Sequence, residues 1–315
     1  MDFALSTNWN SARHADGAAV VDEIVALGFT RIEIGYAFQE MQVPGLLSRL
    51  RDGTVAADSV HAYSPVPLGA PGGHPELFLL AATEEDTRCL AIFHLRRTLG
   101  FAATVGARAI VVHAGRAPLG RRWTRLLRDL DRDDTDRWRH RWNRRLMIRD
   151  RQHRVGRHLD ALRRSLDELL PLFTQAGIAL ALENLPSYDA LPDADELLQL
   201  AGNYPDSPLR YWHDIGHGQI MANAGFADPV ETARRLLPLT AGVHIHDVRG
   251  PTLDHQAPGE GGIAFSDYGF LADPAIIHVF EPAAAVTPAA LKTGLRHLRL
   301  AWERPAAGSF LKDAP

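Results

Sequence analysis

The residues of this sequence that could do chemistry are histidines and carboxylates that follow short apolar runs. In residues 209–218 an apolar run leads into His213, Asp214 and His217. Asp214 and His217 are three residues apart, so both could bind one metal ion or substrate if the run is a strand that ends at an active site. Alternatively, Asp214 caps the following helix and His217 lies in its first turn. This stretch alone leaves both interpretations open.

Several other apolar runs end in the same way, and the groups that follow them are His61, His113, Glu183, His244, His246 and Glu281. In a closed parallel barrel the carboxyl ends of all strands meet at one face, which would make these groups neighbours. Carboxylates mixed with imidazoles suit a divalent ion such as Mn, Co, Mg or Zn and exclude a thiolate site. Each group alone could be a salt-bridged acid or a buried imidazole, but carboxylates packed together repel one another unless a cation or shared proton offsets them.

The elements that must position these groups alternate between short apolar runs and longer segments of helical periodicity. This alternation is typical of βα units around a parallel sheet. The expected strands are residues 3–7, 31–35, 59–61, 109–115, 178–182, 209–212, 241–247 and 275–280, and the expected helices include 16–27, 44–51, 83–105, 158–175, 194–201, 229–237 and 291–302. Eight strands and eight helical segments predict an α/β fold, a single (βα)8 TIM barrel domain over residues 1–315.

One region does not fit a plain barrel. Residues 116–164 contain 17 arginines, no lysine, seven aspartates and no glutamate, which gives a formal charge of +10 in a chain of −4. We expect a helical insertion after the fourth strand, over residues 116–152, since its tryptophans and leucines have helical spacing. It could be a lid or phosphate clamp over the catalytic mouth, but a solvated or subunit-contact hairpin is favoured because charge runs are usually solvated faces.

Composition bounds the remaining function classes. The net charge of −4 argues against a dedicated nucleic-acid binder without excluding nucleic acid. Cys89 is the only cysteine, so one chain can form no disulfide, and we expect it to be a small buried residue within a helix. No run of about 18 apolar residues and no secretory signal pattern occurs. We expect a cytoplasmic protein without membrane contact, and a homo-oligomer stays open.

Short motifs connect these strand ends to a known group of proteins. They are SVHA at 59–62, VVHAG at 111–115, ALEN at 181–184, HDIGHG at 213–218, HIHD at 244–247, PGEG at 258–261 and FEP at 280–282. With them the sequence resembles the xylose isomerase-like barrel superfamily, which includes sugar isomerases, ketose epimerases, inosose dehydratases and apurinic-site endonucleases. The resemblance covers roughly residues 1–115 and 165–302 and leaves out the arginine-rich region.

The resemblance implies roles for individual residues. The metal ligands of the superfamily correspond to Glu183, Asp214, His244 and Glu281. His244 is preferred over His246 because the superfamily pattern places the ligand three residues before an acid, here Asp247. His217 resembles a position that contacts substrate in epimerases and binds an additional metal in the endonucleases. The other expected substrate contacts are His61, His113, His246, Arg249, His255 and Glu260, with a salt bridge as the alternative for Arg249 and Glu260, and a core-edge acid is expected at Glu33.

Three functions compete at this stage. The first is a divalent-metal-dependent isomerase or epimerase of a small sugar, polyol or sugar acid, with or without a phosphate, in which Glu183 and Glu281 exchange protons through an enediolate. The second is an endonuclease of the apurinic-site type, with further metals at His61, His113, His217 and His255 and with DNA phosphates on the arginine-rich insertion. A non-catalytic barrel that binds a metal, a ligand or another subunit ranks last.

Overall fold

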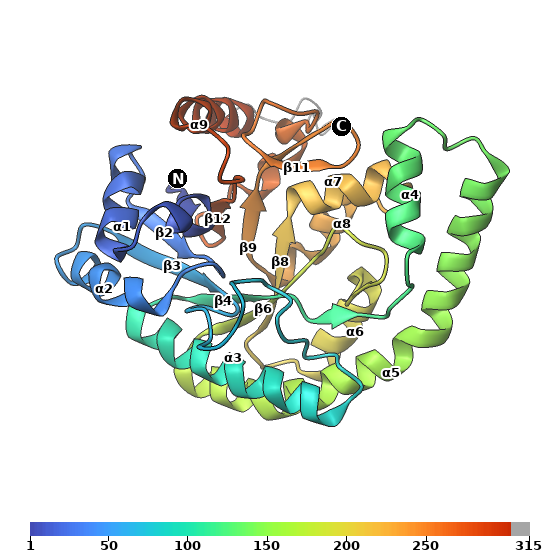
Figure 1. Cartoon of the computed structure of the whole chain (residues 1–315), viewed down its shortest axis with the longest axis horizontal. Coiled ribbons are helices and arrows are strands. Elements are labelled where there is room, and N and C mark those ends of the chain that lie inside the picture. The colour runs from blue at the N-terminus through green and yellow to red at the C-terminus, as the bar shows by residue number, and fades with distance from the viewer. Residues whose placement is uncertain (304–315) are drawn as a thin grey trace, which may run out of the picture.

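The computed structural model describes residues 1–303, whose central feature is a closed barrel of eight parallel strands (Figure 1). The strands are β1 (Ala4–Ser6), β2 (Arg31–Ile34), β3 (Ala56–His61), β4 (Ala109–Val112), β6 (Ala179–Glu183), β8 (Leu209–Asp214), β9 (Thr240–Ile245) and β12 (Ile277–Phe280). They close in the order β1-β12-β9-β8-β6-β4-β3-β2. The predicted (βα)8 barrel is therefore confirmed.

Helices surround the barrel and follow the strands along the chain (Figure 1). The α-helices are α1 (Gly17–Ala26), α2 (Val43–Arg51), α3 (Glu85–Val105), α4 (Arg122–Asp131), α5 (Trp138–Ala176), α6 (Ala194–Asn203), α7 (Ile215–Asn223), α8 (Pro229–Leu236) and α9 (Pro288–Glu303). Short 3-10 segments are η1 (Thr7–Trp9), η2 (Ser11–Arg13), η3 (Glu40–Gln42), η4 (Leu237–Leu239) and η5 (Phe265–Leu271). Within residues 1–303, no helix combines the length and the apolar character that crossing a membrane requires.

Two small hairpins lie outside the barrel sheet. β5 (Gly115–Arg116) pairs antiparallel with β7 (Ala190–Leu191), and β10 (Asp247–Arg249) pairs antiparallel with β11 (Leu253–Gln256). The second hairpin lies in the glycine-rich loop after β9, where the sequence predicted only irregular structure. It places His255 next to the barrel strands, with its ring stacked on that of His246 at 4.1 Å between centroids.

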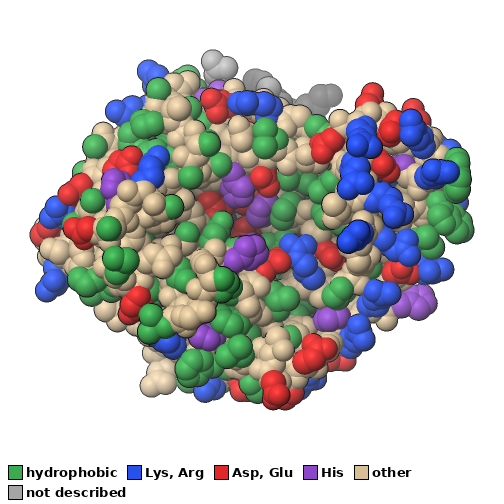
Figure 2. Space-filling model, in the orientation of Figure 1, with side chains coloured by type: hydrophobic (Ala, Val, Ile, Leu, Met, Phe, Trp, Pro, Cys, Tyr) green, Lys and Arg blue, Asp and Glu red, His purple; other side chains and the backbone are tan. Residues whose placement is uncertain are grey.

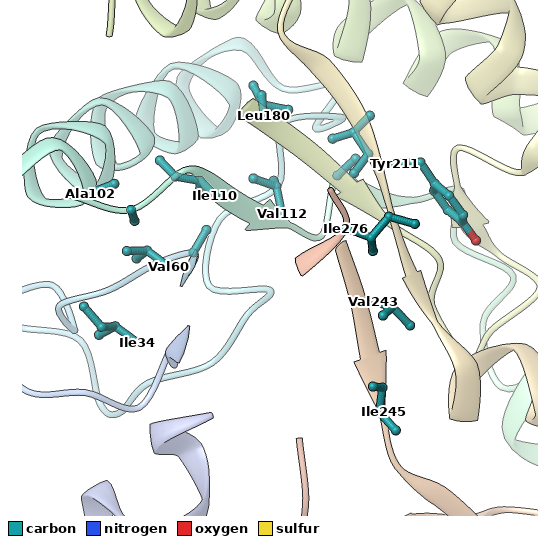
Figure 3. Packing of buried hydrophobic residues seen from close by; sticks show 14 of the residues in the cluster. Ile34, Val60, Ala102, Ile110, Val112, Leu180, Tyr211, Val243, Ile245 and Ile276 are labelled. Carbon is teal, nitrogen blue, oxygen red and sulfur yellow. The ribbon is translucent and has the colours of Figure 1, made fainter. Parts of the chain in front are cut away.

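The strands are apolar on both faces because they pack inside and outside the barrel. In β4, Ala109 and Val111 belong to the interior cluster, whereas Ile110 and Val112 belong to the layer between strands and helices. This alternation follows from the two-residue period of a strand, and Figure 3 shows the outer layer. Inside the barrel a Cβ at Gly242 would lie 2.2 Å from the Trp212 ring. The glycine therefore leaves room for the indole that fills this layer.

The arginine-rich segment, residues 116–152, contains α4 and the first part of α5. These helices form a hairpin beside the barrel, and Leu119, Leu126 and Met147 pack there against Ala224 at the end of α7. α5 begins at Trp138 and continues unbroken into the barrel helix, so the predicted start at residue 158 is wrong by 20 residues. Arginine and leucine are good helix formers, and residues 138–158 contain no proline to end the helix.

Cys89 lies in a helix as expected, but its predicted burial is wrong. The thiol is exposed on α3. Neighbouring positions such as Arg88, Ala91 and Ile92 form the buried face of this helix instead. The residue type alone favoured burial, whereas the helical period decided which face meets the core.

Candidate active site

Asp214 lies where β8 meets α7, and both interpretations of its stretch hold together. Its Oδ1 accepts a hydrogen bond of 2.6 Å from the backbone N–H of His217, so Asp214 caps α7. The same carboxylate lies 3.0 Å from His246 Nε2 and 3.7 Å from His244 Nδ1. A capping aspartate at a strand end therefore also faces the barrel mouth.

The four residues expected to bind metal form one buried group. Glu183, Asp214, His244 and Glu281 each offer a ligand atom, and these atoms all lie within 4.8 Å of one another. His244 Nδ1 is 3.2 Å from Glu183 Oε1 and 3.2 Å from Glu281 Oε2. Figure 2 shows histidine and acidic side chains in a hollow near the centre of this face of the molecule. The group has the donor set of a site for a hard or borderline divalent ion.

Glu183 belongs to a second group as well. Its Oε2 lies 3.1 Å from His113 Nε2 and 3.3 Å from His61 Nε2, while its Oε1 faces His244. The ligand atoms of His61, His113 and Glu183 also lie within 4.8 Å of one another. One carboxylate therefore spans two adjacent groups of ligands.

A third group consists of His217, His246 and His255. The backbone N–H of His255 donates to His246 Nδ1 at 2.9 Å, so Nδ1 carries no proton and Nε2 faces Asp214. A Cβ at Gly216 would lie 2.0 Å from the His246 ring, which explains the glycine of the HDIGHG motif. His255 has a φ of 53°, an uncommon conformation for a residue with a side chain.

The charges of the site are balanced by proximity. Burial raises the pKa of Glu183, but the charges of His244 and His113 outweigh it and hold that pKa well below its ordinary value. Burial likewise opposes protonation of His217, yet the charges of Asp214 and Glu183 raise its pKa to about 10. The pKa of His244 is raised for the same reason by Glu281, Glu33 and Glu183. Closely packed, ionised carboxylates that rely on buried imidazoles for compensation are the chemistry that a divalent ion satisfies, so these residues fit such an ion.

Supporting residues appear that sequence reasoning passed over or ranked low. Asn184 donates from Nδ2 to the Asp214 carbonyl at 2.9 Å and accepts the Asp214 N–H at 2.7 Å, which fixes the peptide of that ligand. Glu33 lies 3.1 Å from His244 Nε2 and accepts from Ser59 Oγ at 2.9 Å. Asn8 donates to Glu281 Oε1 at 3.2 Å. Asn184 and Glu33 follow or occupy strand ends, which is the signal that could have found them.

Two predicted substrate contacts lie apart from the buried groups. Arg249 and Glu260 have exposed side chains in the region of the β10–β11 hairpin, and their charged atoms are 3.9 Å apart. This is the salt-bridge geometry that was the alternative for both. Their contact with substrate stays a prediction, as do the roles of the histidines.

Comparison with known proteins places this architecture. The family model described as xylose isomerase-like TIM barrel matches residues 21–273. An uncharacterized protein of Methanocaldococcus jannaschii, MJ1614, is 30% identical over 114 residues, which cover 35% of this chain and 41% of that protein. Among solved structures, a D-tagatose 3-epimerase-like protein is 20% identical with a TM-score of 0.69, covering 96% of this chain and 99% of that chain. The 3-keto-D-glucoside 4-epimerase YcjR from E. coli is 18% identical with a TM-score of 0.66, covering 95% and 99%.

Proposed function

Because this chain belongs to the xylose isomerase-like TIM barrel family, we propose that it is a divalent-metal-dependent isomerase or epimerase of a small sugar, polyol or sugar acid. The observation that carries the proposal is the placement of two carboxylates, Glu183 and Glu281, around His244 in one buried group. The names of the similar solved structures, a tagatose epimerase-like protein and a keto-glucoside epimerase, support the same class of substrate.

The residues divide the chemistry between them. Glu183, Asp214, His244 and Glu281 would hold the ion, which when bound stabilises negative charge developing on substrate oxygens. One of the two glutamates takes the proton from the carbon next to the substrate carbonyl, and the other returns a proton from the opposite face. Asn8 orients the Glu281 carboxylate, and Glu33 orients the His244 ring from behind. His217 and His246 face the same space and are placed to bind substrate hydroxyls.

The proposal is tested by exchange of a carbon-bound substrate proton with deuterated water. Wild-type, metal-loaded protein is screened against ketoses, polyols and sugar acids, and incorporation of deuterium is followed by mass spectrometry. Glu183→Gln and Glu281→Gln should each lower exchange by at least about 100-fold, because a positioned general base contributes about that much. Glu231→Gln, an exposed glutamate on α8, is the matched control and should exchange normally. Full exchange in both active-site variants would refute the assigned proton transfer.

A multi-metal phosphodiesterase of the apurinic-site endonuclease type is the second candidate. The specific observation in its favour is that the groups His61, His113, Glu183 and His217, His246, His255 flank the four-residue group. Two or three ions in such a cluster would act on both the attacking and the leaving oxygen of a phosphodiester.

The two candidates differ in metal content and in substrate. Elemental analysis of the purified protein should give one tightly bound ion per chain for the isomerase and two or three for the phosphodiesterase. Metal-loaded protein is also incubated with duplex DNA containing an abasic site at low salt. Absence of nicking together with deuterium exchange into a sugar would exclude the second candidate, and nicking that His61→Ala abolishes would favour it.

A further inference from the structure

A cavity of about 370 Å³ lies beside the metal-ligand groups and is lined by residues from α6, α7, α8 and the segment after β6. Asn184 and Gly218 contribute to its wall, and each directly follows a residue of the ligand groups, Glu183 and His217. None of the ligand residues themselves lines it. We call this space the side cavity.

His213 is the buried polar group of the side cavity. Its side chain is 1% exposed, and within the described chain its Nε2 has no hydrogen-bond partner. A Cβ at Gly218 would lie 3.8 Å from the His213 Cε1, so the edge of the ring next to Nε2 faces that wall. Buried polar atoms in native proteins usually have a partner, and an unpaired one that borders a cavity points to a ligand.

The hydrogen-bond order fixes what His213 offers. Asn184 Oδ1 accepts the Asp214 N–H, so it must also be the acceptor of its 2.9 Å contact with the Tyr211 hydroxyl. The hydroxyl spends its proton there, and the 2.8 Å contact between Tyr211 and His213 then requires Nδ1–H to donate. The neutral ring therefore presents an Nε2 lone pair, which accepts a hydrogen bond.

The rest of the wall selects the chemistry of the occupant. Tyr188 and Phe226 stack at 4.1 Å between ring centroids and give the cavity an aromatic surface. Arg235 pairs with Asp195, and Arg151 pairs with Asp193 and Glu196. Asp228 and Glu231, also in the wall, have no cation paired with them in the described chain. Acceptors and aromatic surface suit a molecule rich in hydroxyl donors, and the surplus of carboxylates disfavours an anion.

We propose that the side cavity is a second ligand site that binds a neutral polyhydroxyl compound of monosaccharide size, with one hydroxyl donating to His213 Nε2. The path His213, Tyr211, Asn184 links this site to the backbone of Asp214. Asn184 is thus a positioning residue between the two sites, since its own carbonyl lies 3.0 Å from His217 Nδ1. The proposal stands whether the metal-ligand groups carry out isomerisation or hydrolysis.

The test observes His213 directly, so binding at the metal-ligand groups is not mistaken for it. Protein labelled with 15N-histidine is studied by NMR in its metal-loaded form, and the His213 resonances are assigned by their loss in His213→Phe. We expect Nε2 to carry no proton in the free protein. Glycerol, myo-inositol and D-glucose are the neutral probes, ethylamine is the cationic probe, and acetate is the anionic probe.

A neutral polyol should shift the Nε2 resonance saturably with a Kd of about 1 mM, the affinity expected for a ligand of this size. Met221→Trp, which places an indole in the cavity wall, should weaken that binding at least tenfold. Ala222→Trp, the next residue of α7 and not part of the wall, is the matched control and should bind as wild type. If Met221→Trp fails to fold, Thr232→Trp on α8 blocks the same wall.

Three outcomes would overturn the proposal. A protonated Nε2 in the free protein would refute the deduced tautomer. A shift produced only by ethylamine or only by acetate would refute the ligand class. Polyol binding that survives both Met221→Trp and Thr232→Trp, or the absence of any saturable shift, would show that the side cavity is not the site.

Discussion

The barrel mouth and the arginine-rich segment are the two regions where this chain concentrates charge, and they hold it differently. At the mouth, Glu183, Asp214 and His244 are buried and every charged atom faces another within a few ångströms. On α4, Arg121, Arg125, Arg128 and Arg132 are exposed, and none pairs with an acid of the described chain, although Arg122 and Arg137 do. Figure 2 shows the basic side chains gathered over α4 beside the central hollow.

The difference teaches how much a charged residue type reveals. A buried charge is costly unless it is paired, so its presence at a strand end already restricts what surrounds it. An exposed arginine costs little and contributes little to stability in most settings. The mouth therefore carries information about chemistry, whereas the segment carries information about surface charge. The predictions below test this contrast, beginning with the largest effect.

Removing one charge at the mouth should abolish metal binding. Asp214→Asn keeps the cap of α7, because asparagine caps helices as well as aspartate does, but it removes the negative charge from the four-residue group. We expect metal affinity to fall by at least about 100-fold, more than the loss of a residue that only orients a ligand. Calorimetric titration with Mn and Zn measures it. Asp16→Asn, which alters the capping aspartate of α1, is the control.

The same charges predict a pH dependence of the metal-free protein. The pKa of His217 is raised from 6.5 to about 10 by its acidic neighbours. The pairing of His217 therefore stabilises the fold fully below pH 6.5, and this contribution is lost as the pH rises towards about 10. The Tm of EDTA-treated protein should fall across this interval more steeply in wild type than in His217→Asn. Equal slopes in the two proteins would show that His217 is not charged in the metal-free state.

The sequence predicted the mouth well because the relevant signals are local. Residue types such as Glu183 and His113 directly follow apolar runs, and strand ends meet at one face in any parallel barrel. What it could not give is how distant strands pair. The division of the two Glu183 oxygens between His113 and His244, and the contact of Glu33 with His244, depend on register between strands far apart in the chain.

The arginine-rich segment was harder to predict because its pattern is periodic but lacks clear start signals. The junction between insertion and barrel helix lies inside α5, where Arg151 and Arg154 belong to one continuous helix. The side cavity shows a different limit. His213 was named only as part of a motif, and its unpaired Nε2 follows from the contacts of Tyr211 and Asn184, which no local pattern encodes.

The smallest expected effect concerns the arginines of α4, where we propose a solvated surface. Replacing Arg121, Arg125, Arg128 and Arg132 together by glutamine, a good helix former, should change the free energy of unfolding by no more than about 0.5 kcal/mol. The matched contrast is Arg116→Gln, at the base of the segment. Arg116 bonds Glu76 and Asp189 at 2.9 Å, and its loss should cost about 2 kcal/mol, the usual size for hydrogen bonds to charged groups.

Chemical denaturation compares the four-arginine variant with Arg116→Gln. If four surface charges cost more than the single partly buried one, the contrast between mouth and segment is wrong. A separate measurement decides whether the α4 arginines clamp a phosphate: KM for a phosphorylated substrate is compared with KM for its unphosphorylated form. A solvated surface predicts that the four-arginine variant changes neither value, whereas a clamp raises KM only for the phosphorylated form, since only that form carries the charge that arginine binds.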